Sequence, residues 1–406
     1  MDGARTRGHP GALAAVSAMV RTGVPGAVLL VGPAGGGKTT LAMDLAAGAL
    51  CSAEDPARRP CGACRACRLV ARGVHPDVHR LGPDGPGRQV VIGGPGKPRG
   101  VRDLIAELAL LPIEGGARVA IIEAAHRMNE DAQAALLKTL EEPPAGATII
   151  LCADAEEPLL PTIRSRCARI RLGPVGVRDI EAILVDAGAA DPAAAARLAR
   201  ISGGRPGIAL AWATSPDAVR ERDAIGRSLL DLAPARAADR LSGIRVLAGQ
   251  AATLAGIADG TASPAAGDGG ASGRTRRTPS APTTSAQEPP DGPTTDADQE
   301  EAEVSGPART PAVERRRAGE ALVALWTDVA RDVALCQVGL DRSVRDLALL
   351  DDVRALAVSV DPEALRAFID RLGRASVLIA GNVSPELVLD DLALAWPRPR
   401  VESRAA

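Results

Sequence analysis

A phosphate-binding loop near the N-terminus is the feature that most constrains this chain. Residues 32–39 read Gly-Pro-Ala-Gly-Gly-Gly-Lys-Thr, which matches the G-x-x-x-x-G-K-[ST] motif in full. The loop follows a short apolar run, Ala27–Val31, and precedes a segment with helical character, Lys38–Leu50. In that context the backbone N–H groups and the helix N-terminus surround a phosphate. The sequence therefore predicts an α/β domain with a nucleotide site at this loop.

Each part of the loop has an expected role. The glycines let the backbone turn toward the phosphates, Lys38 meets the β- and γ-phosphate charges, and Thr39 offers its hydroxyl to Mg²⁺. Two side chains outside the loop, from a later strand and from the start of a later helix, are added to the site. The predicted nucleotide-binding residues are Gly32, Pro33, Gly35, Gly37, Lys38, Thr39, Thr40, Glu123 and Arg205.

The strand that should complete an ATPase site carries only one of the two expected acids. Val119–Ile122 is a buried-strand run, and Glu123 and Ala124 follow it. Hydrolysis needs a carboxylate in the Mg²⁺ shell and a second group that polarises water. Glu123 can face the metal, whereas Ala124 cannot act as a base. We interpret the nearby His126 as a surface or junction residue, not as a substitute base.

Strand and helix patterns alternate over the first 170 or so residues. The helical segments are Lys38–Leu50, Val101–Leu111 and Asn129–Leu140, and the strand candidates are Ala27–Val31, Val90–Ile92, Val119–Ile122 and Thr148–Cys152. Asn129 is the expected cap of its helix, with Glu130 and Asp131 in the first turn, where acids suit the helix dipole. Such alternation predicts a parallel sheet covered by helices.

The rest of the chain is helical, apart from one segment of different composition. Near Ala258 the sequence turns to Gly, Pro, Ser, Thr, Asp and Glu, which favours a disordered insertion. The predicted parts are a P-loop domain over 1–173, a small helical lid over 174–214, an all-α domain made of 215–257 plus 313–398, and the insertion at 258–312. The two pieces of the all-α domain are joined in one fold because each alone looks too small for a strong core.

Four of the seven cysteines stand close together in sequence. Cys51, Cys61, Cys64 and Cys67 form a C-x9-C-x2-C-x2-C pattern near 51–67. Four thiolates are the ligand set of a closed, structural Zn²⁺ site, and clustering in an intracellular protein favours metal over disulfides. The alternative is a group of free surface thiols. The sequence predicts a structural zinc module.

Charge and composition exclude several classes of protein. The net charge is −2 and aromatic residues make up 1% of the chain, so no global field attracts nucleic acid and a base-stacking single-strand binder is disfavoured. No apolar run approaches the ~20 residues of a membrane span. The run Ala12–Val20 is interpreted as a helix, not a signal peptide, and the protein as cytoplasmic.

An arginine follows the last predicted strand of the first domain, in Ser165-Arg166-Cys167. The default for a lone arginine is a solvated side chain. The alternative is an arginine finger that projects into the ATP site of a neighbouring subunit. The chemistry of the sequence alone leaves both open.

Several stretches together resemble bacterial AAA+ clamp-loader subunits of the DNA polymerase III type, over most of residues 10–215. The stretches are His75-Pro76-Asp77-Val78, Val101-Arg102-Asp103-Leu104, Glu114-Gly115-Gly116, Ala134–Pro144 and Thr162–Cys167, with the cysteines in the characteristic place. The C-terminal part is similar in style to the family's helical collar, and Asn382–Leu392 to its closing helix. The resemblance implies an AAA+ fold with a lid and an all-α collar domain.

Within this family the resemblance favours the delta-prime type over the gamma/tau motor. Glu123-Ala124 replaces the motor's acid pair, and Ala153-Asp154 stands where the motor often has a phosphate-sensing Thr. The intact Lys38 departs from delta-prime members with an eroded loop. By resemblance, Arg166 is the finger that acts in trans and Arg205 has the lid-sensor position.

The resemblance also implies partners. They are gamma/tau and delta subunits in a hetero-pentamer, the sliding clamp, and primer–template DNA contacted through its phosphates, with no membrane. The expected subunit binds nucleotide with little or no hydrolysis and donates Arg166 to its neighbour. One alternative is an active motor that uses Glu123 as its acid. Another is a zinc-dependent nucleic-acid-binding protein, which the charge and the scarcity of aromatic residues disfavour.

Overall fold

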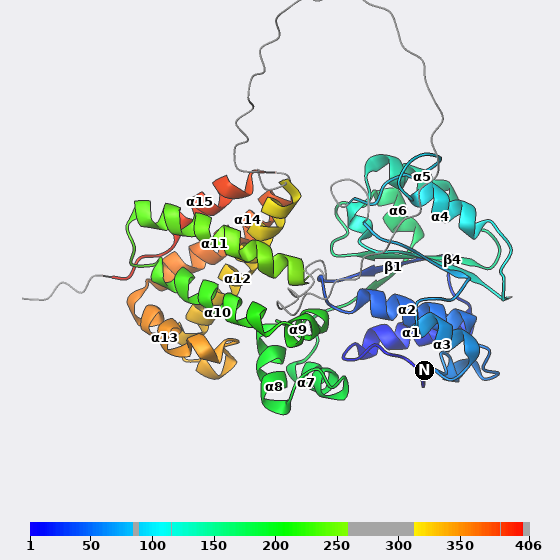
Figure 1. The fold of residues 1–406 in the computed structure, drawn as a ribbon, viewed down its shortest axis with the longest axis horizontal. Coiled ribbons are helices and arrows are strands. Elements are labelled where there is room, and N and C mark those ends of the chain that lie inside the picture. The colour runs from blue at the N-terminus through cyan, green and yellow to red at the C-terminus, as the bar shows by residue number, and fades with distance from the viewer. Residues whose placement is uncertain (84–88, 115, 259–311, 382, 401–406) are drawn as a thin grey trace, which may run out of the picture.

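The computed structural model describes residues 1–83, 89–114, 116–258, 312–381 and 383–400. The predicted insertion at 258–312 lies outside the described residues except at its ends. Ala258 closes helix α11 and Ala312 opens helix α12. The elements fall into an α/β part and a helical part, which lie side by side in Figure 1.

A five-stranded parallel sheet forms the centre of the α/β part. Its strands are β1 (Ala27–Val31), β2 (Val78–Leu81), β3 (Arg118–Ile122), β4 (Ala147–Ala153) and β5 (Ala168–Arg171). They stand in the order β2-β3-β4-β1-β5, so β4 separates the P-loop strand β1 from β3. The three central strands are almost continuous runs of buried aliphatic residues, as expected for strands covered on both faces.

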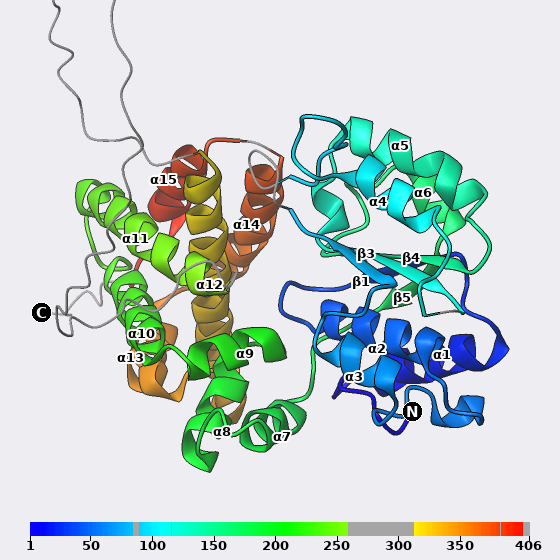
Figure 2. The ribbon, with the colours of Figure 1, turned by 45° about the vertical axis from the view of Figure 1, so that its right-hand side comes forward.

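Helices cover both faces of this sheet (Figures 1 and 2). One face carries α1 (Pro10–Thr22), α2 (Lys38–Leu50) and α3 (Arg65–Ala71), and the other α4 (Val101–Leu108), α5 (Glu130–Glu141) and α6 (Pro161–Arg166). Short 3-10 helices occur at Pro56–Arg58 and Ala125–Arg127. Alternate residues of β1 serve the two cores: Val28 and Leu30 pack on the α1–α2 side, and Leu29 packs on the α4–α5 side.

The helical part begins after β5. It contains α7 (Val177–Asp186), α8 (Pro192–Ile201), α9 (Pro206–Ala213), α10 (Pro216–Asp231), α11 (Ala237–Ala258), α12 (Ala312–Gln337), α13 (Leu350–Ser359), α14 (Pro362–Ala380) and α15 (Pro385–Ala395), with 3-10 helices at Asp341–Ser343 and Leu347–Leu349. One contiguous apolar cluster extends from Val175 to Trp396. The helices on either side of the predicted lid–collar boundary at 214/215 therefore share one core, and the boundary itself stays a prediction.

Aromatic residues anchor the far end of this helical core. Trp326, Phe368 and Trp396 pack against one another, with ring centroids 4.7–5.7 Å apart. The indole N–H of Trp396 donates to the carbonyl oxygen of Leu229 at 3.0 Å, so its one polar atom is satisfied. The last described helix is thus fixed to α10, α12 and α14.

Most predicted elements of the α/β part are present, with three differences. The helix expected over Val101–Leu111 ends at Leu108, and Leu110 and Leu111 are exposed just before Pro112. The strand candidate Val90–Ile92 is a single bridge from Val90 to Met128. Strands β2 and β5, which the sequence analysis missed, read Val-His-Arg-Leu and Ala-Arg-Ile-Arg, so their charged side chains conceal the strand pattern.

Candidate functional site

The phosphate-binding loop leaves β1 and enters α2, as predicted. Gly35 and Gly37 have φ of +73° and +96°, a region that side chains rarely adopt. Gly35 is also tightly covered, because a Cβ built there would lie 2.9 Å from a side-chain carbon of Ile208 in α9. The glycines of the motif therefore allow both the turn and the close approach of the lid helix. The amide of Gly207 donates to the carbonyl oxygen of Gly35 at 2.8 Å.

A cavity of about 710 Å³ opens beside this loop. Its walls are residues 4–9, the loop and the start of α2, the helix α7, and the beginning of α9. Lys38, Thr39 and Thr40 line it, as do Gly35 and Gly37. The volume lies in the range of small-molecule and cofactor sites. The cavity is therefore the candidate nucleotide site, and the lid supplies one of its walls.

The N-terminal wall of the cavity is held by two residues that the sequence analysis did not single out. The carboxylate of Asp44, buried in α2, accepts the backbone N–H groups of Arg5 at 2.9 Å and Thr6 at 2.8 Å. The Nε2 of His9 donates to the carbonyl oxygen of Gly36 at 2.8 Å. The role of Asp44 could have been predicted from the sequence. It is an acid inside the otherwise apolar run of α2, and a buried carboxylate needs hydrogen-bond partners.

The ammonium group of Lys38 has all its hydrogen-bond partners within the protein itself. Its Nζ lies 2.7 Å from the carbonyl oxygen of Gly32, 2.8 Å from that of Pro33, and 2.7 Å from Oδ1 of Asp154. An ammonium has three protons, so these three oxygens use its full capacity as a donor. Asp154 directly follows β4, the strand beside β1. The order of the strands thus brings a carboxylate to the lysine of the loop.

The acid predicted for the metal shell has a different partner. Oε1 of Glu123 accepts from Nε of Arg80, on β2, at 2.7 Å. The next residue, Ala124, has φ +53° and ψ +48°, the left-handed conformation, which costs a residue with a Cβ roughly 1–2 kcal/mol. The chain therefore leaves β3 in a strained turn at the position where the second acid is absent.

His126 is arranged to position Asp154. Its Nδ1 accepts the backbone N–H of Asp154 at 3.1 Å, so the proton of the neutral ring lies on Nε2, 3.5 Å from Oδ2 of Asp154. Burial lowers the pKa of His126, although the charge of Asp154 works in the opposite direction. A neutral ring whose acceptor nitrogen is already occupied is a poor general base, in agreement with its interpretation as a junction residue.

The two arginines singled out from the sequence lie outside this cavity. Arg205 donates from Nε to the carbonyl oxygen of Ser202 at 3.0 Å, and burial lowers its pKa, with Asp328 of α12 opposing that shift. Its side chain is directed toward the helical core, while its neighbours Pro206 and Gly207 line the cavity. Arg166 ends α6, where its Nη2 lies 2.6 Å from Oε1 of Glu141.

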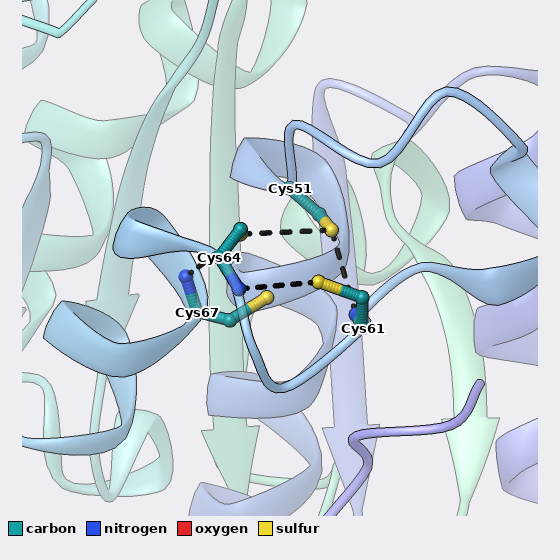
Figure 3. Close-up of side chains that lie close together, drawn as sticks. All are labelled: Cys51, Cys61, Cys64 and Cys67. Carbon is teal, nitrogen blue, oxygen red and sulfur yellow. Dashed lines mark hydrogen bonds between the residues drawn. The ribbon is translucent and has the colours of Figure 1, made fainter.

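The four clustered cysteines converge at the other end of α2 (Figure 3). Cys51 follows the last residue of α2, Cys64 caps the N-terminus of α3, and all four Sγ atoms lie within 4.8 Å of one another. Backbone N–H groups of Cys61, Cys64 and Cys67 donate to the sulfurs of Cys51, Cys61 and Cys64 at 3.3–3.4 Å. These bonds stabilise sulfur as thiolate, the form that binds metal.

The cluster fits a tetrahedral metal ion. With metal–sulfur bonds of ~2.3 Å, neighbouring sulfurs stand about 3.8 Å apart. The Sγ atoms of Cys51 and Cys64 are 3.9 Å apart, far beyond a disulfide bond, and all four cysteines are free. Burial works to raise the pKa of the Cys64 thiol, but the N–H groups of Cys67 and Ser52 outweigh it and lower that pKa to about 6. The cluster can therefore hold a metal ion.

Two of the stretches that carry the family resemblance, those that contain Asp77 and Glu114, contact each other and have a structural role. The fully buried carboxylate of Asp77 accepts the backbone N–H groups of Ile113 at 2.7 Å and Glu114 at 2.9 Å. Nη2 of Arg118 lies 3.7 Å from Oδ1 of the same carboxylate. The segment after α4 is thereby fixed to the start of β2.

The sheet order, the P-loop after β1 and the helical lid define a P-loop domain of the AAA+ type, followed by a helical region. Residues 11–176 match the family described as "DNA polymerase III, delta subunit". The DNA polymerase III subunit delta' of Pseudomonas aeruginosa is 41% identical over 143 residues, 35% of this chain and 42% of the relative. The Escherichia coli subunit delta' is 35% identical over 185 residues, 46% of this chain and 53% of the relative. The resemblance to DNA polymerase III clamp-loader subunits is confirmed for this part of the chain.

Other relatives are named as tau subunits of DNA polymerase III. The DNA polymerase III subunit tau of Salmonella typhimurium is 34% identical over 154 residues, 38% of this chain and 22% of that protein. Among solved structures, a gamma-subunit-related protein of Thermotoga maritima covers 95% of this chain and 98% of its own, with 15% identity and a TM-score of 0.38. The matches to delta' proteins span about half or less of those relatives.

Among the described residues, every helix is too short or too polar to cross a bilayer.

Proposed function

We propose that this chain is a clamp-loader subunit that binds nucleotide, hydrolyses little or none of it, and donates Arg166 to the ATP site of a neighbouring subunit. One observation carries the proposal. The site has an intact phosphate loop and a matching cavity, but Ala124 stands where the second acid is needed. The chain is thus equipped to bind and not to catalyse at its own site.

The local geometry supports weak hydrolysis. Lys38, Thr39 and the loop glycines would hold the phosphates, with the hydroxyl of Thr39 available to Mg²⁺, which would neutralise phosphate charge when bound. Ala124 has no group that activates water, and His126 keeps its acceptor nitrogen on the backbone of Asp154. In the described part of the chain, no residue beside the loop replaces the missing base.

Arg166 is suited to act outside its own subunit. It ends α6, does not line the cavity of its own chain, and its side chain is 35% exposed. Its partner Glu141 is itself half exposed, so the ion pair is weak and can be exchanged for a phosphate. A guanidinium presented in this way fits the role of an arginine finger in trans.

The proposed partners are inferred from the relatives. Proteins named as delta' and tau subunits of DNA polymerase III are similar to this chain over 143 and 154 residues. We propose gamma/tau and delta subunits as ring neighbours in a hetero-pentamer, with the sliding clamp and the phosphates of primer–template DNA as further contacts. The cysteine cluster would hold one structural Zn²⁺, because all four ligand positions are cysteine sulfurs and no position stays open for catalysis.

The alternative is an active motor that uses Glu123 as its acid. The contact of Glu123 with Arg80, and the contact of Lys38 with Asp154, argue against it. The tau relatives are the observation that keeps this alternative worth testing.

The test is an ATPase assay of the purified chain alone, next to the assembly reconstituted with gamma/tau and delta subunits. We expect negligible turnover by the chain alone and stimulated turnover by the assembly. Lys38→Ala should leave the turnover of the assembly within about twofold, because the hydrolysing sites belong to other subunits. Strong turnover by the isolated chain, abolished by Lys38→Ala, would establish the motor instead.

A further inference from the structure

The carboxylate of Asp154 occupies the place where a ligand would meet Lys38. Two protons of the Lys38 ammonium are directed to the carbonyl oxygens of Gly32 and Pro33, within the loop itself. The third is directed to Oδ1 of Asp154 at 2.7 Å. In a phosphate loop the lysine serves the β- and γ-phosphates. The carboxylate therefore competes with these phosphates for the same proton.

The backbone of Asp154 is held beside the loop by its surroundings. It follows β4 directly, and the last residue of that strand, Ala153, is paired with Val31 at the end of β1. Its own backbone N–H is bonded to Nδ1 of His126 at 3.1 Å, and Nε2 of the same ring faces Oδ2 at 3.5 Å. The side chain is 39% exposed, so it can rotate, but its backbone cannot withdraw from the loop.

A triphosphate and a diphosphate meet this carboxylate differently. The β-phosphate is held chiefly by the backbone N–H groups of the loop, which Asp154 leaves free. The γ-phosphate would lie against Lys38 and so within a few ångströms of the carboxylate, where like charges near a protein surface repel strongly enough to change affinity tenfold or more. The repulsion therefore weakens the binding of the triphosphate and not that of the diphosphate.

We propose that Asp154 makes this site selective for nucleoside diphosphates over triphosphates. The inference rests on the proposed binding of nucleotide and adds a direction to it. A subunit with this selectivity keeps a diphosphate, or an empty loop, while its neighbours exchange and hydrolyse triphosphate. Its own shape would then stay constant through their cycle.

Isothermal titration of the full chain with ADP and with the non-hydrolysable AMP-PNP, both with Mg²⁺, tests the inference. The wild-type chain should bind ADP at least about tenfold more tightly. Asp154→Asn keeps the shape and removes the charge, so it should strengthen AMP-PNP binding by about tenfold or more and ADP binding by no more than about threefold. Asp154→Ser should change each affinity in the same direction as Asp154→Asn does. Glu157→Gln, an exposed acid on the same segment, should change neither.

The outcomes separate the selectivity from the binding itself. Equal affinities for the two nucleotides in the wild-type chain, or tighter AMP-PNP binding through a Mg²⁺ bridge to Asp154, would overturn the selectivity and leave the nucleotide site intact. An equal gain for both nucleotides in Asp154→Asn would do the same. Absence of binding by the wild-type chain and both Asp154 variants would refute the nucleotide site as well.

Discussion

Helix α2 carries a candidate ligand site at each end, and the two sites are built in opposite ways. At its N-terminus, the phosphate loop and Lys38 need further site residues from strands that are distant in sequence. Those strands supply Asp154 and Ala124. At its C-terminus, about 20 Å away, Cys51 meets three cysteines that lie close to it in sequence, and the ligand set is complete. Proximity in sequence completes one site, while the order of the strands determines the other.

The difference shows which parts of a site a motif can guarantee. The sulfur ligands converge because one turn and the cap of α3 bring them together, with N–H···S bonds along the way. The residues of the phosphate loop are also close together in sequence, but the residues that catalysis needs are not. Catalysis depends on residues just after β3 and β4. The second residue after β3 is Ala124, and the first after β4 is Asp154, whose carboxylate binds the lysine. A complete loop is therefore compatible with a site that does not hydrolyse.

The largest expected effect comes from breaking the cysteine site. In Cys64→Ser the serine can still cap α3 by accepting the N–H of Cys67, so what is lost is the metal. We expect the bound metal to fall from about one equivalent per chain to none, and the free energy of unfolding to fall by about 3 kcal/mol or more. Elemental analysis and chemical denaturation measure the two effects.

Cys336→Ser is the matched control for that variant. This cysteine lies on α12, partly buried and away from the cluster. The Cys336→Ser protein should keep the bound metal, and its free energy of unfolding should fall little. A Cys64→Ser protein that retains a full equivalent of metal would show that the cluster is not the site.

A smaller effect tests the strained end of β3. Ala124 is the one described residue other than glycine with a positive φ, so Ala124→Gly should remove strain and raise the free energy of unfolding by up to about 1 kcal/mol. The isolated chain should still fail to hydrolyse ATP. Denaturation and turnover assays on the same sample measure both.

Ala109→Gly supplies the contrast. Ala109 is the C-cap of α4 and has φ −74°, where alanine is unstrained, so glycine should destabilise the chain by up to about 1 kcal/mol. If Ala124→Gly is equally destabilising, the left-handed turn is not a source of strain.

The sequence predicted the elements whose signals are local. The phosphate loop with its strand and helix, the cap of α5 by Asn129, and the convergence of four cysteines all depend on residues close together in the chain. Asp154 was noticed only as a departure from the family's motor. Its contact with Lys38 depends on β4 lying beside β1, which no local pattern encodes.

Other features escaped prediction for related reasons. Strand β2 carries His79 and Arg80 at neighbouring positions, and β5 carries Arg169 and Arg171 at alternate positions, so both lack the apolar run of a buried strand. The direction of Arg205 toward α12 depends on how the lid packs on the helical core, a contact between segments more than a hundred residues apart. The role of Arg166 depends on a second subunit, so it stays a prediction.

The most direct test of the account is the steady-state ATPase of the reconstituted assembly with Arg166→Ala in this chain alone. Arg169→Ala is the matched control, since Arg169 is also exposed and paired with a glutamate, Glu156, at 3.3 Å. We predict that Arg166→Ala lowers turnover by tenfold or more, that the control is within twofold of wild type, and that this chain's own affinity for nucleotide is unchanged. Normal turnover of the Arg166→Ala assembly would contradict the central claim that this subunit contributes its chemistry to the site of its neighbour.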